Sequence, residues 1–137
     1  MVNKLAIGTV QFGTSYGISN QSGQTDIEEV AAILAYAREH GIVTLDTAAV
    51  YGNSEAVLGH VLGCRNREAF QIVTKTPHFN AIAITNAELS FLRVTFEQSL
   101  EYLGVSQIEG LLVHACDDLF AENGHRLYHE LEKLKAQ

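Results

Sequence analysis

Four side chains in this sequence have the types and positions that acid–base chemistry requires. Asp46, Lys75 and His114 each stand at the end of a short apolar run, and Tyr51 follows Asp46 by five residues. Such a run is typical of a buried strand, and the carboxyl ends of parallel strands lie along one edge of a sheet. We therefore expect the three residues at successive strand ends, with the tyrosine on the loop after the first.

These residue types fit the reduction of a carbonyl group. Asp46 can pair with Lys75, and the ammonium then lies close to the hydroxyl of Tyr51. A nearby cation stabilises a phenolate, so Tyr51 becomes a competent general acid. His114 can donate a hydrogen bond to the carbonyl oxygen and stabilise the charge that develops there. The hydride must come from a cofactor, because no side chain can supply one.

The rest of the sequence predicts the elements that position these side chains. Apolar periodicity and turn residues predict strand and helix in alternation, four times over. The predicted strands are residues 5–7, 42–45, 70–73 and 108–113, and the predicted helices are residues 25–41, 54–62, 85–104 and a last segment carrying Leu127, Leu131 and Leu134. Residues 11–24 and 64–68 are predicted as a long loop and a polar turn. This order favours an α/β fold with a parallel sheet and right-handed crossovers.

Helix boundaries are indicated by capping residues. Thr25 with Glu28, and Thr85 with Glu88, each have the spacing of a capping box at a helix start. The glycines predicted to end helices are Gly41, Gly63 and Gly104.

Composition restricts the function further. The chain has 137 residues, 47% hydrophobic and 18% charged, with a net charge of −7, which predicts one globular domain over residues 1–137. The excess of acidic residues argues against a nucleic-acid partner, because phosphate binding needs clustered Lys and Arg. No apolar run reaches the roughly 18 residues of a membrane span, so we expect no membrane association and a cytoplasmic location.

Two other groups of residues were considered for chemistry. Cys64 and Cys116 make no CxxC motif, and we interpret them as free thiols in a reducing cytosol; a nucleophile built from Cys116 and His114 is the less favoured alternative. His125 and His129 have a spacing that can bind a metal, but no third ligand accompanies them. We interpret them as part of a solvated helix face and expect no metal site.

The segments GTVQFG, LDTAAVYGNSE, VTK and LLVH resemble the successive signatures of the aldo-keto reductase family. The resemblance runs from Leu5 to the last predicted helix. It implies a (β/α)8 barrel that reduces the carbonyl of a small-molecule aldehyde or ketone with NADPH. It also implies a catalytic tetrad. The residues that match the tetrad are Asp46, Tyr51, Lys75 and His114, and those that match positions near the nicotinamide are Gly8, Thr9 and Asp46.

Length is the departure from the family. The barrel has eight strands in about 250 residues, whereas this sequence predicts four strands, half of a TIM-type barrel. In the family, much of the cofactor site comes from the other half. Open sheet edges and an uncovered apolar face favour association. We therefore expect self-association or a missing C-terminal half, and the alternative to an enzyme is a non-catalytic half-barrel.

Overall fold

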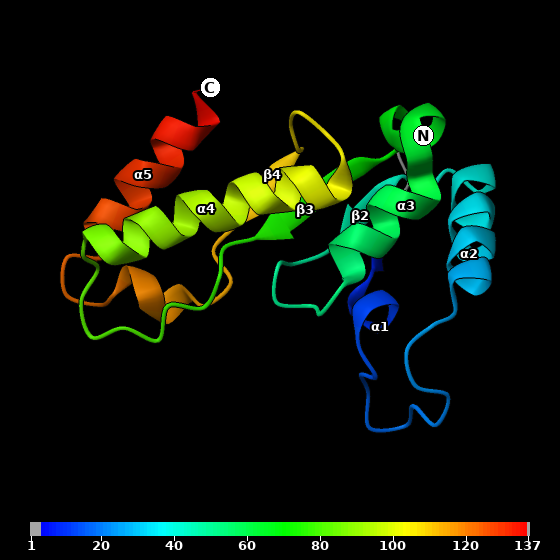
Figure 1. Cartoon of the computed structure of the whole chain (residues 1–137), viewed down its shortest axis with the longest axis horizontal. Helices are drawn as coiled ribbons and strands as arrows, with labels where there is room; N and C mark the ends of the chain where they lie inside the picture. Colours follow the sequence, from blue (N-terminus) through cyan, green and yellow to red (C-terminus); the bar gives the residue numbers. More distant parts are fainter. Residues whose placement is uncertain (1–3, 137) are drawn as a thin grey trace.

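The computed structural model describes residues 4–136, except for the side chains of residues 64–66. Four parallel strands form one sheet in the order β1-β2-β3-β4. The strands are β1 (Ala6–Gly8), β2 (Thr44–Asp46), β3 (Gln71–Lys75) and β4 (Gly110–Leu112), and the helices are α1 (Val10–Gly13), α2 (Ile27–Glu39), α3 (Ser54–Asn66), α4 (Asn86–Leu103) and α5 (His125–Lys135). Two short 3-10 helices, η1 (Arg67–Ala69) and η2 (Cys116–Leu119), complete the order. The predicted α/β fold with a parallel sheet is therefore confirmed (Figure 1).

The two faces of the sheet differ because side chains alternate along each strand. Leu45 and Ile72 lie in register on neighbouring strands, and both are buried in the core beneath α2, α3 and α4. Asp46 and Val73 are likewise in register, but they are only partly buried. No described helix covers that second face, and Leu112 on β4 is 50% exposed. The polar strand-end residues belong to this uncovered side.

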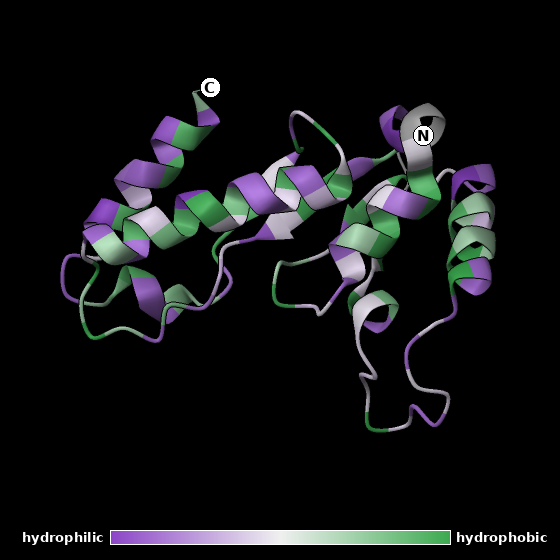
Figure 2. Ribbon diagram, in the orientation of Figure 1, coloured by the Kyte–Doolittle hydropathy of each residue, from purple (hydrophilic) through white to green (hydrophobic). Residues whose placement is uncertain are grey.

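Two hydrophobic clusters hold the helices. The larger joins the sheet to α2, α3 and α4, and its fully buried members include Val30, Leu45 and Leu58. The smaller lies between α4 and α5 around Leu92 and Leu127. Figure 1 shows α3 and α4 running side by side across the sheet, and Figure 2 shows hydrophobic and hydrophilic residues interspersed on α2, α4 and α5. Amphipathic helices bury one face in a core: α2 and α4 contribute to the larger cluster, and α4 and α5 to the smaller.

The second predicted capping box is confirmed and the first is wrong. Thr85 and Glu88 form both reciprocal hydrogen bonds at the start of α4. By contrast, α2 starts at Ile27 with Asp26 as its N-cap and no side-chain capping bond. The backbone N–H of Thr25 instead donates to the carbonyl of Gln11 at 2.9 Å. This tertiary hydrogen bond holds Thr25 outside the helix.

Two other boundaries also differ from prediction. The predicted loop 11–24 begins with a short helix, α1. Gly63 interrupts the helical backbone as predicted, with φ of 54° and ψ of −171°, but helix resumes to Asn66 and continues into η1. The predicted turn at 64–68 is therefore wrong, because that segment contains neither Gly nor Pro to keep it out of helical conformation. Gly41 and Gly104 have the positive φ expected just past α2 and α4.

Candidate active site

The carboxyl ends of β2 and β3 bring Asp46 and Lys75 together. Each is the last residue of its strand, and Asp46 is in register with Val73, two residues before Lys75. Lys75 and Asp46 therefore lie on the same face of adjacent strands. The Lys75 ammonium donates to Asp46 Oδ1 at 2.5 Å and to the carbonyl oxygen of Thr47 at 2.8 Å. The lysine side chain is only 13% exposed, so its charge is compensated inside the protein.

Tyr51 lies on the loop between β2 and α3, and its ring faces the ammonium. Lys75 Nζ is 4.9 Å from the centroid of the Tyr51 ring. The loop is tightly folded: the Tyr51 N–H donates to the carbonyl of Ala48, and the Ser54 N–H donates to the carbonyl of Tyr51. A Cβ on Gly13 of α1 would lie 1.8 Å from the Tyr51 carbonyl oxygen. Helix α1 therefore supports this loop by backbone contact that only glycine permits.

His114 completes the group from the loop after β4. Its backbone N–H donates to Thr76 Oγ1 at 3.1 Å, which ties it to the residue that follows Lys75. Its ring meets the Tyr51 ring edge-on, with centroids 5.8 Å apart. The structure therefore brings together all four residues that the sequence selected for acid–base chemistry.

The environment of His114 favours its neutral form. Burial lowers the pKa of His114 most, the charges of His78 and Lys75 lower it further, and Asp46 opposes them. Its Nδ1 is buried and has no hydrogen-bond partner among the described residues. We place the ring proton on Nε2, because a buried N–H without an acceptor is rarer than a bare acceptor. The neutral ring can then donate one hydrogen bond from Nε2.

Three buried hydroxyls lock the strand ends to α3. Ser54 Oγ lies 2.9 Å from both the carbonyl oxygen and Oγ1 of Thr9, and 3.2 Å from Thr47 Oγ1. Thr9 Oγ1 donates to the carbonyl of Asp46 at 3.0 Å. Sequence reasoning treated Ser54 only as a helix start and gave Thr47 no role. The sequence marked Ser54 and Thr47 as site residues only by their position inside the LDTAAVYGNSE segment.

Glu55 is a buried carboxyl that sequence reasoning also missed. It is 4% exposed, and Thr74 Oγ1 donates to its Oε1 at 2.6 Å. Burial raises the pKa of Glu55, and hydrogen bonds from the Thr74 and Ser99 side chains oppose that rise. Glu55 thus connects α3 with β3 and α4. Its partner on β3, Thr74, is the residue directly before Lys75.

A cleft of about 530 Å³ opens beside Asp46, Tyr51 and His114. Its lining residues are Gly8, Thr9, Val10, Thr14, Tyr16, Asp46, Val50, Tyr51, His78 and His114. It therefore includes all three residues, Gly8, Thr9 and Asp46, that the family resemblance places near a nicotinamide. His78 was predicted only as a loop residue. The sequence signal that could have placed His78 in the cleft was its position, just after Pro77 and beyond the strand that carries Lys75.

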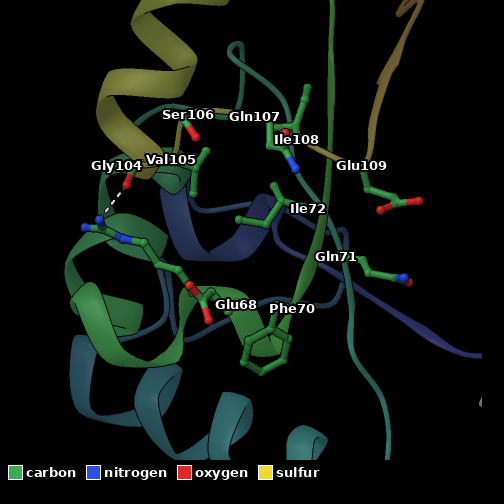
Figure 3. A pocket seen from close by; sticks show the side chains of 11 residues that line it. Glu68, Phe70, Gln71, Ile72, Gly104, Val105, Ser106, Gln107, Ile108 and Glu109 are labelled. Carbon is green, nitrogen blue, oxygen red and sulfur yellow. Dashed lines mark hydrogen bonds between the residues drawn. The ribbon is translucent and has the colours of Figure 1, made fainter.

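A second cavity, of about 580 Å³, lies at the opposite ends of β3 and β4 (Figure 3). It is bounded by Phe70, Gln71 and Ile72 near the start of β3 and by residues 104–109, which lead into β4. Arg67 donates to the carbonyl of Gly104 at its edge. None of the four acid–base residues lines it, so the candidate active site is the cleft at the carboxyl ends.

The other sequence-selected groups stay apart from the cleft. Cys116 is a free, exposed thiol, whereas the side chain of Cys64 lies outside the described residues. The rings of His125 and His129 meet edge-on with centroids 6.1 Å apart. Within the described part of the chain, no three His, Cys, Asp or Glu residues gather as metal ligands. Among residues 4–136, no helix has the length and apolar character that a membrane crossing needs.

Comparisons with known proteins point to one family. The model of the Aldo/keto reductase family matches residues 4–137. Two solved structures from Pseudomonas aeruginosa, both described as aldo-keto reductases, superpose with TM-scores of 0.79 and 0.77, at 34% and 32% identity. They cover 98% of this chain, and the chain covers 52% and 50% of theirs. It therefore spans about half the length of these relatives, as expected for half of a (β/α)8 barrel.

A more distant structure shares the fold alone. An aldo-keto reductase from Klebsiella pneumoniae, in complex with NADPH, has a TM-score of 0.51 and 23% identity. That match covers 64% of this chain and 29% of the Klebsiella protein. No curated protein matches the chain.

Proposed function

The chain belongs to the aldo/keto reductase family, and on that premise we propose that it carries the reacting half of an NADPH-dependent carbonyl reductase. The observation that supports this most is the placement of Lys75. Its ammonium is paired with Asp46 and lies 4.9 Å from the Tyr51 ring centroid, beside the cleft that Tyr51 and His114 line. The proposed substrate class is small-molecule aldehydes and ketones.

Each residue of the group has a distinct role in the proton transfer. Tyr51 donates its hydroxyl proton to the carbonyl oxygen as that oxygen becomes an alkoxide. The Lys75 ammonium stabilises the phenolate that remains, and Asp46 holds the ammonium in place. Neutral His114 donates a hydrogen bond from Nε2, which orients the carbonyl and stabilises the developing charge.

The cleft fits one end of the proposed cofactor better than the other. Gly8 has nothing within 4 Å of where a Cβ would stand, so a flat ring can approach the backbone beside Thr9 and Asp46. A bound nicotinamide supplies the hydride. The phosphates need cations, and the residues lining the cleft include no Arg or Lys. We propose that Gly8, Thr9 and Asp46 contact the nicotinamide end and that the phosphates are held by groups beyond this cleft.

A covering partner is part of the proposal. Strands β1 and β4 each pair with one neighbour, and none of the helices within residues 4–136 covers the sheet face that carries Asp46 and Lys75. A second barrel half, from a C-terminal segment or from another copy of the chain, would close both edges. The uncovered face also favours the alternative function, a non-catalytic half-barrel that self-associates.

An NADPH fluorescence titration separates these functions, followed by a carbonyl-reduction assay on any protein that binds. Saturable binding in the micromolar range, with turnover that falls by about 10²-fold or more in Tyr51→Phe, is the expected result for a reductase. Tyr102→Phe, on an exposed part of α4, is the matched control and should retain activity. No binding up to millimolar NADPH would favour the non-catalytic alternative, and full activity in Tyr51→Phe would refute the assigned proton donor.

A further inference from the structure

His78 is a titratable residue of the cleft to which neither the family signatures nor the proton transfer assigns a role. It lies on the loop after β3, three residues beyond Lys75. Its ring packs against that of His114, with centroids 4.1 Å apart and planes inclined by 44°. Both rings line the cleft. His114 thus contacts two rings, Tyr51 and His78, of which only His78 can become a cation.

Two imidazoles at this separation cannot both be charged without strong repulsion. His114 also faces the Lys75 ammonium from β3, the Asp46 carboxylate from β2 and the Tyr51 ring from the β2–α3 loop. Lys75 and Asp46 form an ion pair, so their effects on His114 oppose each other. A protonated His78 would add a positive charge that is not paired with an anion among these groups.

The two rings differ in their exposure to solvent. His78 is exposed, so water can solvate its charge, whereas His114 is partly buried with Nδ1 out of contact with solvent. Charging the more buried ring costs more desolvation energy. Once His78 is protonated, its charge further disfavours a second proton on His114.

We infer that His78 is a positioning residue: its ring, packed against that of His114, disfavours a charge on His114, so that His114 serves as a hydrogen-bond donor and not as an acid. The role of His114 in the reaction rests on the proposed reductase function, whereas the contact between the two rings does not. A protonated imidazole is a far stronger acid than a phenol, since their ordinary pKa values are about 6.5 and 10. A charged His114 would therefore compete with Tyr51 for the proton delivery that the mechanism assigns to the tyrosine.

The test is a pH titration of the six histidine ring signals by ¹H–¹³C NMR on the whole chain, with signals assigned by single substitutions. The quantity measured is the midpoint of the His114 signal in the unsubstituted chain.

Substitution then measures the coupling between the rings. His78→Phe keeps a ring against His114 and removes the charge, so the His114 midpoint should move to higher pH. His60→Phe, on the exposed side of α3, is the matched control and should leave that midpoint unchanged. His78→Gln gives a second uncharged variant in case the phenyl ring disturbs the loop. An unchanged His114 midpoint in both His78 variants would overturn the inference.

This readout needs neither cofactor nor turnover. A failure of the NADPH titration would therefore leave the histidine coupling standing, and an absent coupling would leave Tyr51 as the proposed acid. The two proposals can fail independently.

Discussion

Gly13→Ala is expected to be one of the most disruptive single-methyl substitutions near the candidate site. Gly13 is the last residue of α1 and is buried against the loop that carries Tyr51. An added Cβ would lie 1.8 Å from the Tyr51 carbonyl oxygen and 2.4 Å from the Ser54 nitrogen. Both are backbone atoms, so no side-chain rotation can make room.

The size of the effect follows from the displacement required. Cβ contacts below 3.0 Å essentially never occur, so α1 and the loop must separate by more than 1 Å. Overpacking of this kind costs roughly 1–3 kcal/mol, and we expect about 3 kcal/mol because both sides are rigid backbone. That is a large part of the roughly 5–15 kcal/mol by which a domain is stable. The separation would also move Tyr51 away from Lys75.

Urea unfolding followed by circular dichroism measures this cost. A loss of about 3 kcal/mol, with a slope of about 1–3 kcal/mol per molar urea, lowers the midpoint by roughly 1–3 M. Gly8→Ala is the matched control, because a Cβ there meets nothing within 4 Å and should change stability by no more than about 1 kcal/mol. A Gly13→Ala midpoint equal to that of the control would refute the assigned contact between α1 and the Tyr51 loop.

Three further predictions concern stability. Thr85→Ala removes the capping box of α4 and should cost about 1 kcal/mol in urea unfolding, whereas Thr25→Ala, which makes no capping bond, should cost clearly less. Burial raises the pKa of Glu55, so the folded chain holds this proton more tightly than the unfolded chain, and stability should fall as pH rises from about 4.5 through the raised pKa. Glu55→Gln should remove that fall in denaturation curves recorded across pH, and an unchanged pH profile would contradict the assignment. Leu92→Ala empties a fully buried position between α4 and α5 and should cost about 2–5 kcal/mol, so a smaller loss in thermal melting would indicate that the second cluster repacks.

The features that the sequence predicted well depend on local pattern. The Thr85 capping box and the glycine after Leu103 are fixed by residues within a few positions of each other, and both are confirmed. The strand ends at Asp46 and Lys75 were found because an apolar run followed by a polar residue marks the rim of a parallel sheet. Half of the barrel was predictable for the same reason, since each strand–helix unit carries its own periodicity.

The features that the sequence did not predict depend on contacts between distant segments. Thr25 has the spacing of a capping box, but its N–H is taken by Gln11, fourteen residues earlier. The burial of Glu55 depends on Thr74 and Ser99, which only the packing of α3 against β3 and α4 brings together. The contact between the tilted rings of His78 and His114 likewise joins residues 36 positions apart. No local pattern encodes such pairs.

The contacts that arrange the four acid–base residues all lie within these four strand–helix units. Strand register sets Asp46 beside Lys75, the Ser54–Thr9 hydrogen bonds anchor the Tyr51 loop, and Thr76 holds the backbone of His114. The arrangement of these four residues therefore forms without a second barrel half. The residues lining the cleft include no Arg or Lys, so we propose contacts beyond this cleft for the phosphate-bearing part of a dinucleotide. We therefore expect a second barrel half, supplied in trans, to strengthen NADPH binding without rearranging Asp46, Lys75 or Tyr51.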